Sequence, residues 1–154
     1  MAIRENLELI RNNIENACRR VKRDPQQVQL LAVCKDQGPE KIRQVLDLGI
    51  RLLGENKTQE AEAHMRHFTG IRVDWHFIGK LQKNKINKIL SMFHFIESVD
   101  GVKSLEHIHK RVDDPVEVFI EAFRQIQSRA LAEISDRIVQ NITDDVFDVQ
   151  RQAP

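Results

Sequence analysis

The chain has 154 residues, 41% of them hydrophobic and 31% charged, and this length and composition predict a single globular domain with a sizeable core. The formal net charge of +1 gives no general attraction to nucleic acid or to an anionic membrane, and no apolar run approaches the roughly 20 residues that span a bilayer. We therefore expect neither nucleic acid nor a membrane as its partner. The two cysteines are isolated and lack metal or redox spacing, and the first segment lacks the apolar stretch of a signal peptide. Both features predict a cytoplasmic protein.

The chain begins with a helical pattern and then turns into a buried strand. Hydrophobic residues three and four positions apart predict an amphipathic helix over residues 3–21. The apolar run 28–35 predicts the first strand. A helix follows from Pro39 to Gly49, a glycine placed where helix C-termini commonly have one.

The same alternation recurs through the first 122 residues. Further strands are predicted at 50–53, 73–78, 94–99 and 116–122, and further helices at 56–67, 82–92 and 102–111. Strands that alternate with helices of about ten residues are typical of βαβ units and a parallel sheet.

The pattern changes after Ala122. A single hydrophobic stripe predicts one long amphipathic helix within 123–140, and residues 141–154 form a polar tail. We therefore expect an α/β domain over 1–122, followed by this helix and this tail. All 6 glycines of the chain precede residue 102.

Lys35 stands where the first predicted strand opens into a loop. A lysine amine attacks an aldehyde only when it is unprotonated, and shielding from water at a strand end favours that form. Functional groups of parallel barrels lie at the carboxyl ends of the strands, which is where Lys35 falls. The alternative is a solvated surface lysine. The neighbouring Cys34 is expected to be a small buried hydrophobe rather than a reactive thiol.

Asn56 closes the motif Gly54-Glu55-Asn56 after the second predicted strand. Gly54 would allow a tight turn, and Asn56 is a plausible helix N-cap, with Gln59 completing a capping box. The residues alone therefore favour a structural role for Asn56.

His76 lies in the segment Trp75-His76-Phe77-Ile78-Gly79, which ends the third predicted strand. On a strand, His76 and Ile78 share one face and Trp75 and Phe77 the other. A lone histidine in an apolar strand is usually a hydrogen-bonded core residue, and a role at a ligand is the alternative. His64, His67 and the pair His107 and His109 are expected on solvated helix faces, without a metal.

These three segments, in this order and spacing, resemble the pyridoxal 5′-phosphate homeostasis proteins (the YggS/PROSC-type family). The most specific match is Trp75 to Gly79 followed by Leu81-Gln82 and Asn84-Lys85, and the resemblance covers residues 1–121. It implies a TIM-type barrel like the N-terminal domain of alanine racemase. In this chain that barrel would be partial, with about five parallel strands and a long C-terminal helix.

The resemblance also implies a cofactor, pyridoxal 5′-phosphate, held as a Schiff base on Lys35, with Asn56 and His76 as further cofactor-binding residues. The family's phosphate-binding loops lie in the later part of its barrel, which needs roughly 250 residues in all. Such loops need glycine, and this chain has none after residue 101. No phosphate-binding residue can therefore be transferred, and we expect a shortened or rearranged form of the family.

Three functions follow from this comparison. The first is a non-catalytic protein that binds pyridoxal 5′-phosphate and takes part in vitamin B6 and amino-acid homeostasis. The second is a truncated remnant that folds or forms a homo-oligomer covering the open sheet edge, but binds the cofactor weakly or not at all. The third, a racemase-like or transaminase-like enzyme, is disfavoured because the chain has no tyrosine to act as the usual racemase base.

Overall fold

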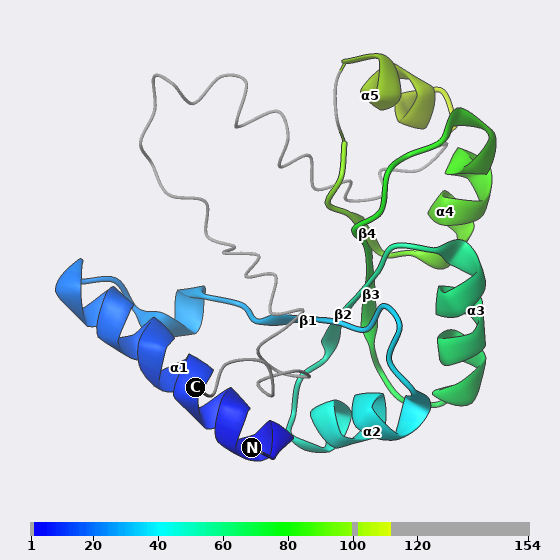
Figure 1. Ribbon diagram of the computed structural model, residues 1–154. Helices are drawn as coiled ribbons and strands as arrows, with labels where there is room; N and C mark the ends of the chain where they lie inside the picture. The colour runs from blue at the N-terminus through cyan, green and yellow to red at the C-terminus, as the bar shows by residue number, and fades with distance from the viewer. Residues whose placement is uncertain (1, 100–101, 112–154) are drawn as a thin grey trace, which may run out of the picture. The chain divides into compact units, whose positions relative to one another are not determined.

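The computed structural model describes residues 2–99 and 102–111 (Figure 1). The predicted fifth strand at 116–122, the helix within 123–140 and the tail at 141–154 lie outside the described residues. The chain divides into two compact units, and their described parts are residues 2–51 and the residues from Leu52 onward.

The first unit contains two helices, a single turn of 3-10 helix and one strand. These are α1 (Ile3–Arg20), η1 (Pro25–Gln27), β1 (Leu31–Val33) and α2 (Pro39–Asp47). All three residues of β1 are buried, as the apolar run 28–35 predicts, but the strand is shorter than that run. Gly49 has φ of +90° and follows Leu48, the C-cap of α2, so its predicted place at the helix C-terminus is confirmed.

The second unit contains three strands, three helices and one 3-10 turn. These are β2 (Leu52–Glu55), α3 (Thr58–His67), β3 (Asp74–Phe77), η2 (Lys83–Lys85), α4 (Ile86–Met92), β4 (Phe95–Ile96) and α5 (Val102–His109). Each predicted helix and strand up to residue 111 is therefore present. Strands β1, β3 and β4 are shorter than predicted, whereas β2 has the predicted length but begins two residues later.

Strands β2, β3 and β4 of the second unit form one sheet, in that order. Within the second unit β2 pairs in parallel with β3, and Leu53 lies opposite Trp75. Strand β3 pairs in parallel with β4, and His76 lies opposite Phe95. The predicted α/β fold with a parallel sheet is confirmed, whereas closure toward a partial barrel stays a prediction.

The two faces of this sheet have different neighbours. Phe77 contacts Phe93, at the end of α4, with ring centroids 5.2 Å apart and planes at 67°. On the opposite face His76 stacks on Phe95. The predicted division of the third strand into two faces therefore matches these contacts, with the α4 side carrying the apolar core.

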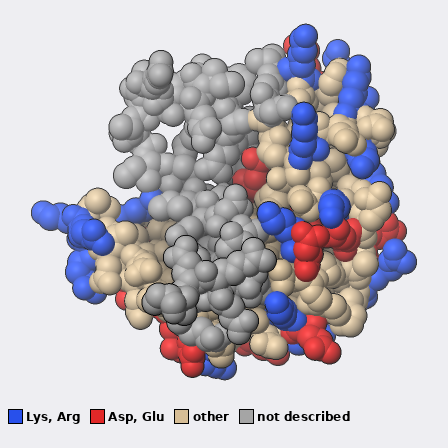
Figure 2. Space-filling model, viewed as in Figure 1, with Lys and Arg blue, Asp and Glu red and all other residues tan. Residues whose placement is uncertain are grey.

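The surface of the described residues is charged but mixed in sign. Figure 2 shows acidic and basic side chains interspersed on one face, with basic side chains gathering where Figure 1 draws α4 and α5. No helix within the described ranges has both the length and the apolar character needed to cross a membrane.

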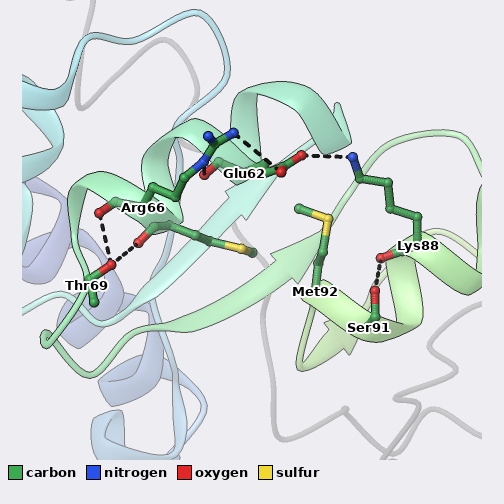
Figure 3. A pocket seen from close by; sticks show the side chains of 7 residues that line it. Glu62, Arg66, Thr69, Lys88, Ser91 and Met92 are labelled. Atoms are coloured by element: carbon green, nitrogen blue, oxygen red, sulfur yellow. Dashed lines mark hydrogen bonds and ion pairs between the residues drawn. The ribbon is translucent and has the colours of Figure 1, made fainter.

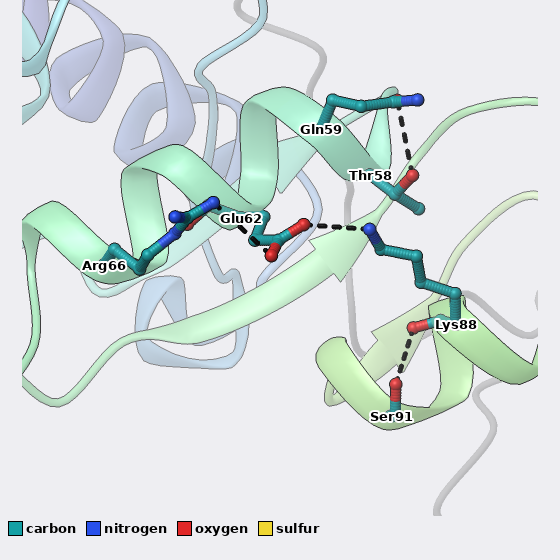
Figure 4. Close-up of polar contacts among 6 residues, drawn as sticks. All are labelled: Thr58, Gln59, Glu62, Arg66, Lys88 and Ser91. Atoms are coloured by element: carbon teal, nitrogen blue, oxygen red, sulfur yellow. Dashed lines mark hydrogen bonds and ion pairs between the residues drawn. The ribbon is translucent and has the colours of Figure 1, made fainter.

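An ion pair joins α3 to α4 (Figure 4). A Glu62 carboxylate oxygen accepts from the Lys88 ammonium at 2.8 Å, and the other oxygen lies 3.4 Å from the Arg66 guanidinium. The hydrogen bond from Lys88, then the charges of Lys88 and Arg66, hold the pKa of Glu62 below its ordinary value. The pair is solvated, so its contribution to stability is small and depends on salt.

We expect Lys88→Met to lower the thermal midpoint of unfolding slightly at neutral pH. Because the pKa of Glu62 is depressed by folding, the pair stabilises the protein above the unfolded pKa, and this stabilisation is lost as pH falls through the folded pKa. The difference between variant and wild type should therefore vanish in acid, as measured by circular dichroism melts across pH. Lys80→Met, at an exposed lysine of the same unit, is the control. An equal difference at every pH would contradict the assignment.

Candidate functional site

The carboxyl ends of β2, β3 and β4 lie at the same edge of the sheet because the strands run parallel. Pairing continues past the strands: the Ile78 amide donates to the Glu55 carbonyl at 2.9 Å, and the Glu97 amide donates to the Phe77 carbonyl at 2.9 Å. We call Asn56, His76, Gly79 and Glu97 the strand-end site.

His76 is the most constrained side chain of the strand-end site. It is 2% exposed, and its Nδ1 lies 2.6 Å from Oε1 of Glu97, a side chain that is itself 7% exposed. Its ring stacks on Phe95 with centroids 4.4 Å apart and planes at 15°. The other ring nitrogen, Nε2, is buried and has no hydrogen-bond partner among the described residues.

Asn56 and Gly79 meet through their backbones. A Cβ on Gly79 would lie 2.2 Å from the Asn56 carbonyl oxygen, so this approach requires glycine. The Ser98 hydroxyl donates to the Gly79 carbonyl, which ties the segment after β4 to the same place. The Asn56 side-chain oxygen Oδ1 is buried and has no partner within the described part of the chain.

The strand-end site therefore presents two buried polar atoms, Oδ1 of Asn56 and Nε2 of His76, that no described side chain satisfies. Buried polar atoms of folded proteins are nearly always hydrogen-bonded to protein, water or a ligand. An incoming polar molecule could supply the missing partners, so the site fits ligand binding.

Lys35 is half-buried and lies two residues beyond the end of β1, as predicted from the sequence. The backbone turns there: the Gln37 amide donates to the Cys34 carbonyl at 3.0 Å, and Asp36 has φ of 58°. Cys34 is fully buried, which confirms its predicted role as a small hydrophobe. The structure brings Asn56 and His76 together in the second unit, whereas Lys35 belongs to the first.

Two sequence-based interpretations are wrong. The N-cap of α3 is Lys57 rather than Asn56, and no side chain caps that helix. His64 is not solvated: its side chain is 12% exposed, and Nδ1 lies 2.8 Å from Oε1 of the fully buried Glu55. His67 is exposed, as predicted.

Sequence reasoning missed Glu55 and Glu97 as partners of the two buried histidines. A usable signal exists for Glu97, because it follows Phe95 by two positions and so continues the face of β4 that meets His76. The Glu55 to His64 contact joins a strand end to the second turn of the next helix, and no periodic pattern marks it.

A second candidate is the open groove between α3 and α4, with a volume of about 540 Å³ (Figure 3). Its lining residues are Glu62, Met65, Arg66, Thr69, Lys88, Ser91 and Met92. The Ser91 and Thr69 hydroxyls donate to backbone carbonyls, and Glu62 pairs with both cations of the lining. Since these groups satisfy one another, the strand-end site is the stronger candidate.

Comparison with known proteins places the chain among relatives. No protein-family model matches. A pyridoxal phosphate homeostasis protein of Haemophilus influenzae is 34% identical over 113 residues, which are 72% of this chain and 48% of that protein. The chain spans about half the length of the curated relatives that it matches.

Solved structures agree with this relationship. PipY of Synechococcus elongatus, without PLP, is 35% identical with a TM-score of 0.54 over 64% of this chain and 46% of that one. PipY with PLP bound gives 26% identity and a TM-score of 0.55 over 82% and 67%. The resemblance to pyridoxal phosphate homeostasis proteins that the sequence motifs indicate is confirmed.

We expect His64→Ala to lower the free energy of unfolding by roughly 3 kcal/mol, because it leaves the buried Glu55 carboxylate without its partner. Urea denaturation measures the change. His67→Ala, at an exposed histidine on the same helix, should cost less than about 1 kcal/mol. Equal losses in the two variants would contradict the assignment of the Glu55 to His64 pair.

We expect Gly79→Ala to destabilise the protein by about 2 kcal/mol or more, because the added Cβ overlaps backbone atoms that cannot rotate away. The matched control is Gly38→Ala, where a Cβ meets nothing within 4 Å. Thermal melts of the two variants give the comparison. A neutral Gly79→Ala would show that the approach of Asn56 to Gly79 is not rigid.

Proposed function

We propose that this chain, which over 72% of its length is homologous to a pyridoxal phosphate homeostasis protein, binds pyridoxal 5′-phosphate. We propose further that it serves vitamin B6 and amino-acid homeostasis by holding the cofactor rather than by turning over a substrate. The relationship to PipY, solved both without PLP and with PLP bound, supports this proposal.

The observation that carries the proposal is the pair of buried, unsatisfied atoms at the strand-end site, Oδ1 of Asn56 and Nε2 of His76. A polar heterocycle would give both atoms the partner that the described residues do not provide. An aromatic ring borders the pair as well, since the His76 ring lies flat on Phe95. This pair of unsatisfied atoms therefore fits a polar aromatic ligand.

Lys35 is the residue that we assign to covalent attachment. The cofactor would supply an aldehyde, and a lysine amine is the protein group that bonds to aldehydes. The half-buried position of Lys35 just beyond β1, in a turn fixed by the Gln37 to Cys34 hydrogen bond, supports its selection over the exposed lysines.

A second candidate is a protein that folds or self-associates but binds the cofactor weakly. The observation that favours it is the 48% coverage of the Haemophilus influenzae relative, because this chain matches only about half of that protein. A homo-oligomer would then cover an open sheet edge, and sedimentation velocity at several concentrations would reveal it.

We expect purified protein mixed with micromolar pyridoxal 5′-phosphate to develop the absorbance band of lysine-bound cofactor, and Lys35→Ala to abolish it. Lys41→Ala is the control, because Lys41 is exposed on α2 and hydrogen-bonds Gln37 at 3.2 Å. Amino-acid racemisation assays should show no turnover. Absence of the band in the unmodified protein at millimolar cofactor would instead support the weak-binding candidate.

A further inference from the structure

The carboxylate of Glu97 has no part in the proposed function, yet it makes a short contact in the strand-end site. It lies 2.6 Å from Nδ1 of His76, on a side chain that is 7% exposed. Its backbone amide donates to the Phe77 carbonyl, so the carboxylate is carried by a segment that remains paired to β3. The histidine is fixed on its other side by stacking on Phe95.

The identity of the partner decides which nitrogen of His76 carries the proton. In its ionised form Glu97 only accepts hydrogen bonds, and Nδ1 is then the donor in the 2.6 Å contact. A neutral imidazole has one N–H, and its other nitrogen is an acceptor. With the proton on Nδ1, the buried Nε2 presents a lone pair.

Nε2, which carries this lone pair, is one of the two unsatisfied atoms of the strand-end site. The Glu97 contact gives the fold one hydrogen bond, but it leaves Nε2, two covalent bonds away on the same ring, as a buried acceptor without a partner among the described residues. The free-energy cost of that unpaired acceptor is comparable to the gain from the hydrogen bond, so packing alone does not explain Glu97. A ligand that donates to Nε2 removes this cost. The arrangement is the one by which carboxylates orient histidines at binding sites, where the second partner fixes the tautomer.

We propose that Glu97 is a positioning residue that keeps His76 in the Nδ1–H tautomer, so that Nε2 accepts a hydrogen bond from an N–H or O–H group of the bound ligand. This inference rests on the proposed function, because the ligand is taken to be pyridoxal 5′-phosphate. That cofactor offers a group of the required kind, its protonated ring nitrogen.

The tautomer can be tested without any ligand. Two-bond ¹H–¹⁵N correlation spectra of the ligand-free protein at neutral pH should show the proton of His76 on Nδ1. Glu97→Met removes the acceptor at nearly constant size, and the Nδ1–H preference should be lost. Glu97→Gln should restore much of it, since the amide oxygen can still accept from Nδ1. A proton on Nε2 in the unmodified protein would overturn the proposal.

The role of Nε2 is tested by two substitutions of His76. In His76→Asn the amide nitrogen takes the place of Nδ1 and can still donate to Glu97, but the acceptor at Nε2 is gone. In His76→Gln the amide oxygen can reach the place of Nε2. Titration with pyridoxal 5′-phosphate should show affinity falling roughly tenfold in His76→Asn and Glu97→Met, and less in His76→Gln and Glu97→Gln.

Equal affinity in all four variants and the unmodified protein would overturn the proposal while leaving cofactor binding intact. Failure of the proposed function gives a different result: the unmodified protein binds no cofactor, and the ligand-free spectra alone then decide whether Glu97 sets the tautomer. Loss of folding in Glu97→Met, seen by circular dichroism, leaves the Glu97→Gln and His76→Asn measurements to decide the role of the pair.

Discussion

The close approach of Gly79 to the backbone of Asn56 is the constraint on which the strand-end site depends. No residue with a Cβ fits there, since that atom would lie 2.2 Å from the Asn56 carbonyl oxygen. Two hydrogen bonds hold together the segments that follow the three strands of the second unit. The Ile78 amide donates to the Glu55 carbonyl, and the Ser98 hydroxyl donates to the Gly79 carbonyl. Backbone, rather than flexible side chains, therefore sets the spacing of the strand-end site.

Two buried carboxylate–histidine pairs use the sheet in different ways. The Glu55 to His64 pair connects the end of β2 to α3, so it anchors a helix to the sheet. The His76 to Glu97 pair connects β3 to the end of β4 and leaves an unsatisfied nitrogen. In the first arrangement the histidine has a structural role, because His64 holds a helix in place. In the second pair the unsatisfied atom belongs to the histidine, Nε2 of His76, whereas in the first it is Oε2 of Glu55.

Much of this fold could be predicted because hydrophobic periodicity reports local structure directly. The alternation of apolar runs with amphipathic segments located each described helix and strand, and the position of Lys35 beyond β1 followed from the same run. The partners of the histidines could not be predicted in this way. Glu97 lies 21 residues from His76, so only the register of β3 against β4 brings them together, and register is a property of the folded sheet.

The wrong role for Asn56 has a related cause. An asparagine followed three positions later by glutamine fits a capping box, but α3 begins one residue later than that pattern requires, at Thr58. The backbone of Asn56 is engaged instead by Gly79, a contact between residues far apart in the chain. Local signals therefore assigned Asn56 a helix-capping role that it does not have, and its cofactor-binding role stays a prediction.

The burial of both sulfur atoms has a practical consequence for spectroscopy. Cys18 and Cys34 are the only cysteines of the chain, and their exposed fractions are 4% and 0%. In the folded state neither is open to a maleimide. One cysteine introduced at the exposed position of Leu9 would thus accept a fluorophore or spin label selectively, with both native thiols left in place.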